Sequence, residues 1–222
     1  MRRRDFDYWI LITILLLLTL GVSMVYSASS YYALRKFDNK EYFLMRQLTW
    51  AAVGIVAMLI FSRLDYRKIA RLSPIMMLVS IILLILVIIP GIGSNINDSW
   101  RWFNLGFASF QPSEMAKLSV ILFFSFSLSK KSDLLQSFWK GFVPYLCIIG
   151  IVDVLLMKEP HYSGTILISA VAVIIMFSAG AKIWHFVLVS LLVVPLGVYF
   201  AFSAEYRLER ILTFLDPFAD PT

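Results

Sequence analysis

The sequence has little charge and almost no cysteine or histidine, and each shortage excludes a class of protein. Charged residues make up 15% of the 222 positions and apolar residues 60%, against about 25% and 45–50% in a water-soluble domain. The single cysteine, Cys147, excludes a disulfide framework and a thiolate zinc site. His161 and His185 are too few to suggest a zinc centre. We therefore expect a chain that folds in lipid, without disulfide or zinc stabilisation.

Long apolar runs are abundant instead. They form seven blocks, and crossing the hydrocarbon core takes about 20 residues. The pattern predicts an all-α polytopic membrane protein with about seven transmembrane helices, arranged as a single transmembrane domain over residues 1–222. The blocks lie near residues 8–26, 44–61, 75–92, 113–128, 141–157, 164–181 and 183–202, and an outer loop begins at 203.

The net charge of +6 is spread along the flanks of the apolar blocks. This distribution argues against nucleic acid as a partner and points to membrane topology instead. Three arginines follow Met1 without a signal-peptide cleavage pattern, and the loop 63–71 is dense in basic residues. Because short basic loops stay in the cytoplasm, we expect a cytoplasmic N-terminus. The segments around Trp100, Glu159 and Asp216 then lie outside.

The segment between the third and fourth blocks places Arg101 between Trp100 and Trp102. Tryptophans at this position fit the aromatic belt of a membrane interface. Alternatively, the planar guanidinium of Arg101 binds a phosphate while the indoles stack on sugar or lipid. The residue pattern leaves both interpretations open.

Glu114 and Lys117 lie three residues apart, on one face of the fourth predicted span. Each charge would cost about 2.5–3.5 kcal/mol at mid-bilayer. We therefore expect both side chains to face the protein interior or a wet cavity. A structural ion pair between helices is the alternative.

A second polar region surrounds the end of the fifth block. Asp153 interrupts the block itself, and an intramembrane carboxylate suggests a functional site or, alternatively, a partner for Lys117. Glu159 follows at the outer end. His161 fits either a proton carrier or a polar loop residue.

The third polar region follows the last block. Arg207 and Arg210 lie one helical turn apart and could grip a pyrophosphate, or they could snorkel to lipid headgroups. Asp216 follows in a run of Asp-Pro pairs. No cofactor site is evident, and a requirement for a divalent cation stays open.

Three separated motifs match one family. They are residues 101–106 (Arg-Trp-Phe-Asn-Leu-Gly) with 111–117 (Gln-Pro-Ser-Glu-Met-Ala-Lys), residues 159–165 (Glu-Pro-His-Tyr-Ser-Gly-Thr), and residues 206–210 (Tyr-Arg-Leu-Glu-Arg) with 214–221 (Phe-Leu-Asp-Pro-Phe-Ala-Asp-Pro). On these motifs the chain resembles the SEDS family (shape, elongation, division and sporulation), which includes RodA, FtsW and SpoVE. The second motif is most similar to that of FtsW and SpoVE of Gram-positive bacteria.

The resemblance implies a peptidoglycan glycosyltransferase of the bacterial cell membrane that uses lipid II, a disaccharide-pentapeptide on undecaprenyl pyrophosphate, for division, sporulation or cell shape. It also implies ten spans in an intact member. The implied partners are a class B penicillin-binding transpeptidase and other divisome or elongasome membrane proteins. Together with the residue patterns it predicts nine substrate-binding residues: Arg101, Trp102, Glu114, Lys117, Asp153, Glu159, Arg207, Arg210 and Asp216.

The resemblance implies that the carboxylate usually assigned as catalytic base lies beyond the Asp-Pro segment. We therefore expect the 222-residue chain alone to be inactive, whether it is a fragment of a longer protein or the product of an interrupted reading frame. Two other function classes stay open. Glu114, Lys117 and Asp153 suggest a lipid II flippase or another transporter, because intramembrane charges often line translocation paths. A non-catalytic membrane scaffold of the division machinery would leave these charges with structural roles only.

Overall fold

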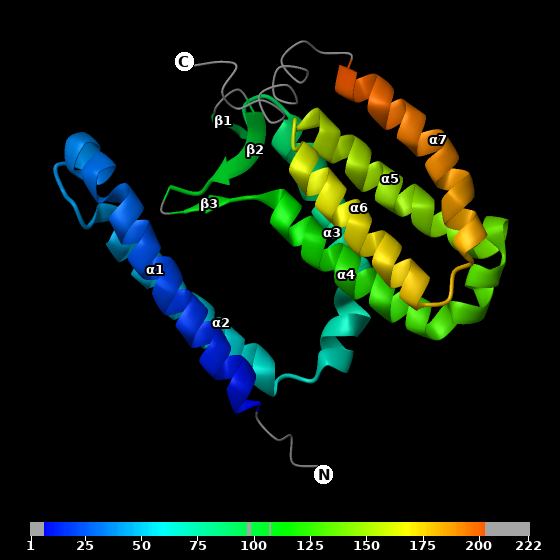
Figure 1. The fold of residues 1–222 in the computed structure, drawn as a ribbon, viewed down its shortest axis with the longest axis horizontal. Coiled ribbons are helices and arrows are strands. Elements are labelled where there is room, and N and C mark those ends of the chain that lie inside the picture. Colours follow the sequence, from blue (N-terminus) through cyan, green and yellow to red (C-terminus); the bar gives the residue numbers. More distant parts are fainter. Residues whose placement is uncertain (1–6, 97–98, 107, 203–222) are drawn as a thin grey trace, which may run out of the picture. The chain divides into compact units, whose positions relative to one another are not determined.

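The computed structural model describes residues 7–96, 99–106 and 108–202. Within these ranges it has seven α-helices and three short strands (Figure 1), which confirms the predicted all-α membrane fold and its number of helices. The chain divides into two compact units, Met1–Tyr66 and Arg67–Thr222. The prediction of a single transmembrane domain stays a prediction.

The first unit is a helical hairpin of α1 (Tyr8–Phe37) and α2 (Tyr42–Arg63). Asp7 caps α1 by accepting hydrogen bonds from the backbone N–H groups of Trp9 and Ile10 at 3.0 and 3.2 Å, which satisfies two of the free donors of a helix start. α1 ends at Asp38, whose left-handed φ of 53° turns the chain. At this turn the rings of Phe37 and Tyr42 stack with their centroids 4.0 Å apart.

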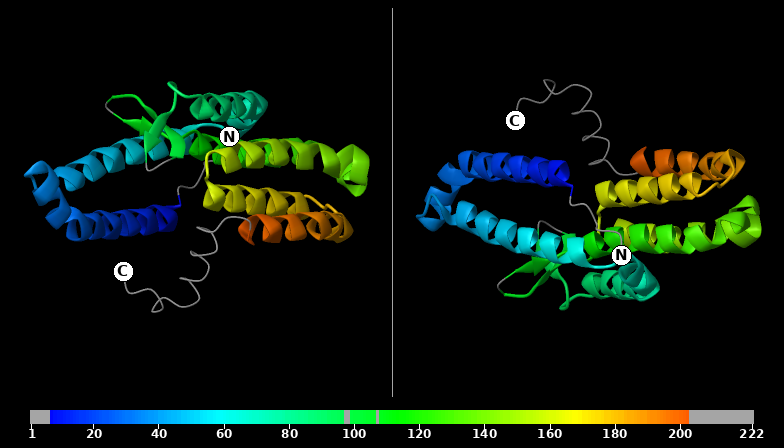
Figure 2. Two further views of the ribbon diagram at one scale, coloured as in Figure 1. Left: turned by 90° about the horizontal axis from the view of Figure 1, so that it is seen from above. Right: turned by 90° about the horizontal axis from the view of Figure 1, so that it is seen from below.

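The second unit contains α3 (Tyr66–Ile88), α4 (Pro112–Lys131), α5 (Val143–Lys158), α6 (Tyr162–Ser178) and α7 (Ile183–Phe202). α4, α5 and α6 pack against one another. The Ser119 hydroxyl of α4 donates to the Met76 carbonyl of α3 at 3.2 Å. Both views in Figure 2 show α3 and α7 at opposite edges of this bundle.

The core of the bundle follows one narrow stripe on each helix. In α4 the buried side chains recur every fourth residue, at Ala116, Val120, Phe124 and Leu128, which is the spacing of one helix face. Similar stripes bury Ser73, Met77, Ser80, Leu84 and Val87 in α3, Tyr145, Ile149, Val152 and Leu156 in α5, and Gly164, Ile168, Ala172 and Met176 in α6. Serine, alanine and glycine on these stripes let helices approach closely, as is typical inside membranes.

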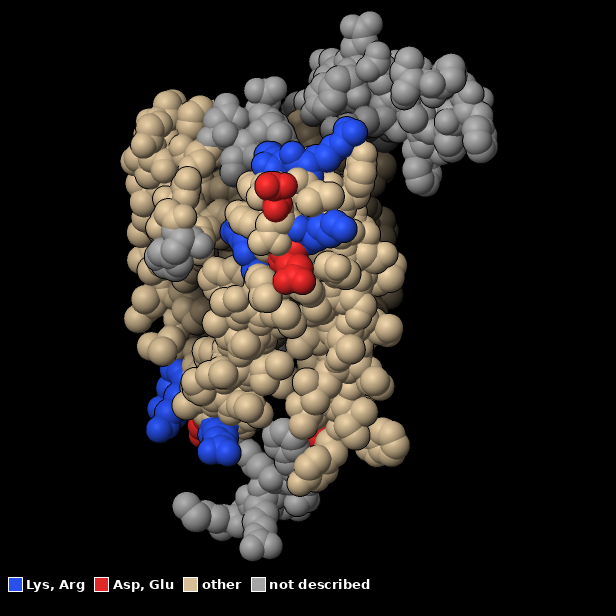
Figure 3. All heavy atoms as spheres, turned by 90° about the vertical axis from the view of Figure 1, so that its left-hand side faces the viewer, with Lys and Arg blue, Asp and Glu red and all other residues tan. Residues whose placement is uncertain are grey.

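Four described helices are long and apolar enough to cross a membrane by length and composition: α1, α2, α3, and α5 together with the π-helical turn Phe138–Phe142 before it. α6 and α7 include shorter apolar stretches. On the face drawn in Figure 3, charged side chains form a few groups, and most of the surface consists of other residues. A surface with so few charges suits contact with lipid.

A small antiparallel sheet precedes α4 and was not predicted. Its strands are β1 (Ser94–Ile96), β2 (Ser99–Asn104) and β3 (Ser109–Phe110), in that spatial order. At the β2–β3 turn Gly106 has φ +82°, a conformation that glycine adopts without strain. The Asn104 side chain accepts a hydrogen bond from the Gly106 N–H at 3.0 Å. β2 contacts α4, so the sheet carries its side chains to the end of the helical bundle.

Candidate functional site

Arg101 of β2 joins the sheet to the turn between α5 and α6. Its Nε–H donates to the backbone carbonyl oxygen of Glu159 at 2.8 Å, and its Nη2 donates to the carbonyl oxygen of Pro160. These carbonyls follow the end of α5, where helix carbonyl groups have no partner of their own and carry partial negative charge. A guanidinium has five N–H donors, so three have no partner among the described residues and can bind another ligand.

The Glu159 side chain lies buried in the same turn. It has no exposed surface, and neither carboxyl oxygen has a hydrogen-bond partner within the described part of the chain. Burial raises the pKa of Glu159 to about 8, and the charge of Arg101 opposes this shift. An uncompensated buried carboxylate is costly, so the neutral acid predominates at pH 7.

His161 follows Glu159 by two residues and is half-buried. Burial lowers its pKa from the usual value; Arg101 and Lys117 also lower it, while Glu114 raises it. These effects show that the charges of β2 and α4 reach the α5–α6 turn. A Cβ atom at Gly164 would overlap the His161 imidazole, so the first turn of α6 leaves space for this ring.

Glu114 and Lys117 form an ion pair on α4, with Lys117 Nζ 2.9 Å from both carboxylate oxygens. The Glu114 side chain is 59% exposed and that of Lys117 is 28% exposed. They are partners within one helix, so the geometry gives no sign of an ion pair joining two helices. Lys117 pairs with Glu114 in this structure, whereas Asp153 has another partner.

Asp153 lies away from this group, inside α5. Its Oδ2 accepts a hydrogen bond from the Ser169 hydroxyl of α6 at 2.6 Å, and its Oδ1 is buried without a partner among the residues described. Six residues of helix rise separate it from Glu159, about 9 Å. Asp153 therefore connects two helices below the α5–α6 turn.

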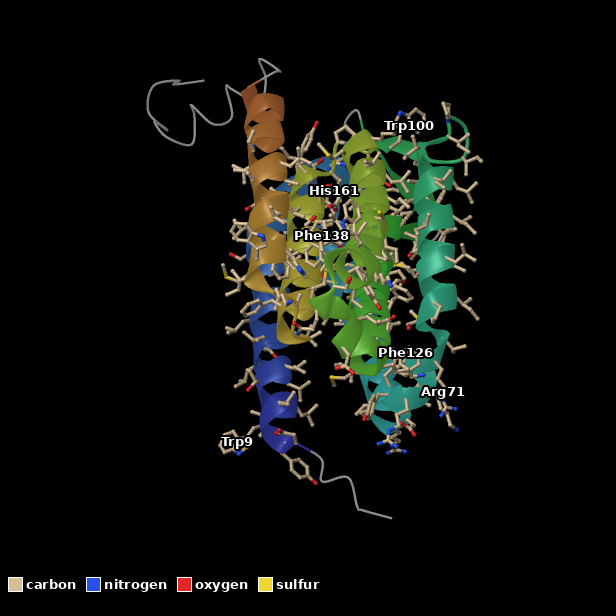
Figure 4. All side chains as sticks on the ribbon, turned by 90° about the vertical axis from the view of Figure 1, so that its right-hand side faces the viewer. Trp9, Arg71, Trp100, Phe126, Phe138 and His161 are labelled. Carbon is tan, nitrogen blue, oxygen red and sulfur yellow. The ribbon has the colours of Figure 1, made fainter. Side chains whose placement is uncertain are left out.

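Trp100 and Trp102 flank Arg101 on β2 and are partly exposed. The register of β2 against β1 shifts across Arg101, because Asn95 pairs with Trp100 and Ser94 pairs with Trp102, and a β-bulge of this kind interrupts the alternation of side chains between the two faces. Figure 4 shows Trp100 and His161 toward one end of the second unit, and Phe126 and Arg71 toward the other. The polar residues of β2 and of the α5–α6 turn thus share one end of the bundle.

The structure brings together five of the residues discussed from the sequence: Arg101, Glu114, Lys117, Glu159 and His161. We call them the outer cluster. Arg207, Arg210 and Asp216 lie outside the described residues. Across the described ranges, no three or more His, Cys, Asp or Glu side chains form a group that could hold a metal ion.

Two features of the cluster were missed from the sequence. The carbonyl groups of Glu159 and Pro160 hold Arg101, and Gly164 makes room for His161. A contact across 58 positions leaves no local pattern, and every residue type has a backbone carbonyl. The sequence did give one indication of this contact. The polar motifs that contain Arg101 and Glu159 lie on the same side of the membrane in the predicted topology.

Comparison with known proteins finds the same chain architecture elsewhere. The family model described as "Cell cycle protein" (FtsW, RodA, SpoVE) matches residues 8–222. The "Probable peptidoglycan glycosyltransferase FtsW" of Trichlorobacter lovleyi is 38% identical over 221 residues, covering all of this chain and 58% of the relative. "Stage V sporulation protein E" of Bacillus subtilis is 40% identical over 216 residues, covering 97% of this chain and 59% of the relative.

Two solved structures are also similar. One, titled "Structural coordination of polymerization and crosslinking by a peptidoglycan synthase complex", matches 99% of this chain and 62% of its own with a TM-score of 0.79 and 25% identity. The other is the rod shape determining protein RodA of Thermus thermophilus, which matches 81% of this chain and 57% of its own with a TM-score of 0.55 and 25% identity. The chain spans about three-fifths of the length of the relatives that it matches.

Proposed function

Because the chain belongs to the FtsW/RodA/SpoVE family of cell cycle proteins, we propose that its protein is a peptidoglycan glycosyltransferase that polymerises glycan from lipid II. The family predicted from the three motifs is thereby confirmed. Two similar relatives bear the names of a probable peptidoglycan glycosyltransferase and of a sporulation protein. The substrate, the reaction and the partners of this chain are our proposals.

The observation that carries the proposal is the position of Arg101. Two backbone carbonyl groups fix its guanidinium, while its remaining N–H donors are free to bind a planar or tetrahedral anion. The ammonium group of Lys117, close enough to influence His161, adds a second cation. A fixed guanidinium, with a second cation whose charge also acts on His161, suits the diphosphate of a lipid-linked sugar.

The reaction needs this kind of site. A sugar hydroxyl of the acceptor attacks the anomeric carbon of the donor, the bond to the diphosphate breaks, and the hydroxyl proton passes to a base. Fixed cations stabilise the charge that develops on the departing diphosphate. We propose that Arg101 and Lys117 bind the diphosphate, that Glu114 orients Lys117, and that Trp102 stacks on sugar or lipid.

Four further residues are proposed as ligands from the sequence pattern. Arg207, Arg210 and Asp216 remain proposed ligands from sequence. Asp153 remains a proposed ligand as well, although its hydrogen bond to Ser169 favours a connection between helices. We assign no catalytic base.

We further propose a cytoplasmic N-terminus and an outer cluster that faces the outside of the cell, where lipid-linked precursors are polymerised. A similar solved structure is titled as a peptidoglycan synthase complex that coordinates polymerization and crosslinking. This supports a crosslinking partner for the present protein, which we propose to be a class B penicillin-binding transpeptidase. Other membrane proteins of division or elongation are further proposed partners.

The test follows labelled lipid II in proteoliposomes. The chain is joined to the remaining C-terminal part of the Bacillus subtilis relative, and three quantities are measured: lipid II binding, transfer between leaflets, and growth of glycan on a gel. We expect binding and glycan growth, both lost in Arg101→Ala and retained in Arg35→Ala, a matched change on the exposed end of α1.

Each other outcome favours a different function. Transfer of lipid II between leaflets without glycan growth would indicate a flippase. The absence of lipid II binding in a chimera that folds normally would leave the scaffold interpretation and end the glycosyltransferase proposal.

A further inference from the structure

The Glu159 carboxyl occupies an unusual position beneath Arg101. The main-chain carbonyl of Glu159 accepts a hydrogen bond from Arg101, yet its own carboxyl oxygens accept none from any described residue. The side chain is fully buried. The guanidinium of Arg101 and the carboxyl of Glu159 therefore both lie at the α5–α6 turn without forming an ion pair.

This arrangement is stable only in one protonation state. A buried carboxylate without hydrogen bonds is strongly disfavoured, whereas the neutral acid costs far less. If the carboxylate did form, the nearest source of compensation would be the guanidinium of Arg101, whose charge already acts on it. The ionised Glu159 and an anionic ligand would then compete for the same N–H donors.

We propose that Glu159 is a positioning residue, which by holding a proton leaves the guanidinium of Arg101 free for the diphosphate of the substrate. The inference rests on the proposed function, because it takes a diphosphate as the ligand.

Other charged groups surround the turn, and their contributions differ. α4 contributes Glu114 and Lys117, which neutralise each other as an ion pair. α5 contributes Lys158, which is exposed, and Asp153, which bonds to Ser169. His161 begins α6, and because its pKa is lowered from 6.5 it is neutral above pH 7. Among the described residues, Arg101 is the charged group that acts on Glu159.

Protonation of Glu159 determines how binding depends on pH. Since the pKa of Glu159 is raised to about 8, the residue is neutral at pH 7 and ionised at pH 9. If only the protein with neutral Glu159 binds the diphosphate, the apparent Kd grows as the competent fraction falls. Affinity should therefore weaken about tenfold between pH 7 and pH 9.

The experiment measures lipid II binding to the protein in nanodiscs from pH 6.5 to pH 9. Lipid II is suitable because its diphosphate is esterified at both ends and keeps a constant charge over this range. We expect the wild type to lose about tenfold in affinity, Glu159→Gln to bind equally well throughout, and Glu159→Asp to retain a pH dependence. Glu41→Gln, an exposed matched control in the first unit, should follow the wild type.

A second readout needs no ligand and stays valid if a variant binds poorly. The infrared carbonyl band of a protonated carboxyl should be present at pH 7, fall to about half its intensity near pH 8, lose most of it by pH 9 and be absent in Glu159→Gln. Binding with the same pH profile in wild type and Glu159→Gln, or a wild type without that band at pH 7, would overturn this inference alone. A folded wild type that binds no lipid II at any pH would overturn the proposed function and this inference with it.

Discussion

At the scale of single residues, the function of Arg101 depends on its shape as much as on its charge. One planar group reaches two successive carbonyl oxygens of the α5–α6 turn and keeps further donors free. A lysine offers a single nitrogen on a flexible stem and cannot reproduce this fork. Replacing Arg101 by lysine therefore separates the effect of the planar geometry from that of the positive charge.

Arg101→Lys retains the positive charge but should leave one of the two carbonyls without its charged donor. Because hydrogen bonds to charged groups are each worth about 1.5–3 kcal/mol, we expect destabilisation of this size and at least about tenfold weaker lipid II binding. Thermal unfolding and a binding titration measure the two effects. Wild-type affinity and stability in Arg101→Lys would show that a point charge suffices.

Gly164 offers a second test at this scale. The Cβ of Gly164→Ala would overlap the His161 imidazole, so the ring must leave its present position in the outer cluster. Overpacking of this kind costs about 1–3 kcal/mol, and we expect that loss in the free energy of unfolding, together with weaker lipid II binding. Both are measured in detergent and in nanodiscs.

The matched control is Gly150→Ala in α5, where a Cβ meets nothing within 4 Å. There the same substitution should be neutral or stabilising by up to about 1 kcal/mol, because alanine favours the helix. Adding His161→Ala to Gly164→Ala removes the clash and should restore the lost stability. If the double variant is as unstable as Gly164→Ala, the imidazole is not the group in conflict.

At the scale of helices and strands, the apolar blocks predicted where helices lie but not which face of each is buried. Ile149 and Ile151 are equally apolar, yet Ile149 belongs to the core and Ile151 is 51% exposed. In a membrane protein lipid replaces water, so hydrophobicity no longer distinguishes the two faces. Packing between helices decides instead, and the sequence does not display it.

The helix ends also depart from the blocks for physical reasons. α1 runs to Phe37, eleven residues past the predicted block end at Tyr26, since a helix continues through polar residues once it has left the hydrocarbon. α3 begins at Tyr66 and contains Pro74, because proline is tolerated in membrane helices where neighbouring groups satisfy the freed backbone. The sheet over 94–110 was missed because its tryptophans and asparagines also fit an interfacial loop.

The Asp153–Ser169 hydrogen bond joins α5 and α6, and its removal measures how much it stabilises their packing. Ser169→Ala removes the hydroxyl that α6 offers to α5. Hydrogen bonds between membrane helices contribute about 0.6 kcal/mol on average and up to about 1.7. We therefore expect a loss of stability in this range, measured by unfolding, with lipid II affinity unchanged.

Ser190→Ala on α7 is the matched control, because its hydroxyl donates only to the Val187 carbonyl of the same helix. It should alter stability by less than about 0.5 kcal/mol. A drop in lipid II affinity in Ser169→Ala, absent in Ser190→Ala, would instead favour Asp153 as a substrate ligand.

At the scale of the whole molecule, composition alone indicated a membrane protein, and the motifs indicated its family. The outer cluster could be predicted in part, because Arg101, Lys117 and Glu159 lie in motifs that the expected topology places on one side. Its internal geometry could not, since the hydrogen bonds of Arg101 link residues 58 and 59 positions apart. The proposal that this cluster faces the outside of the cell concerns the orientation of the whole chain, and it can be tested by experiment.

Topology can be tested with two exposed positions that bracket α4. Leu105 lies in the β2–β3 turn before this helix, and Asp133 lies just after it. The helix has 20 residues, about 30 Å at 1.5 Å per residue, so the predicted span would place its two ends at opposite membrane surfaces. In a Cys147→Ser background, Leu105→Cys should react with a membrane-impermeant maleimide in intact cells, and Asp133→Cys only after permeabilisation. The reverse pattern would place the N-terminus outside and turn the outer cluster toward the cytoplasm, where Arg101 could not meet a precursor presented at the cell exterior.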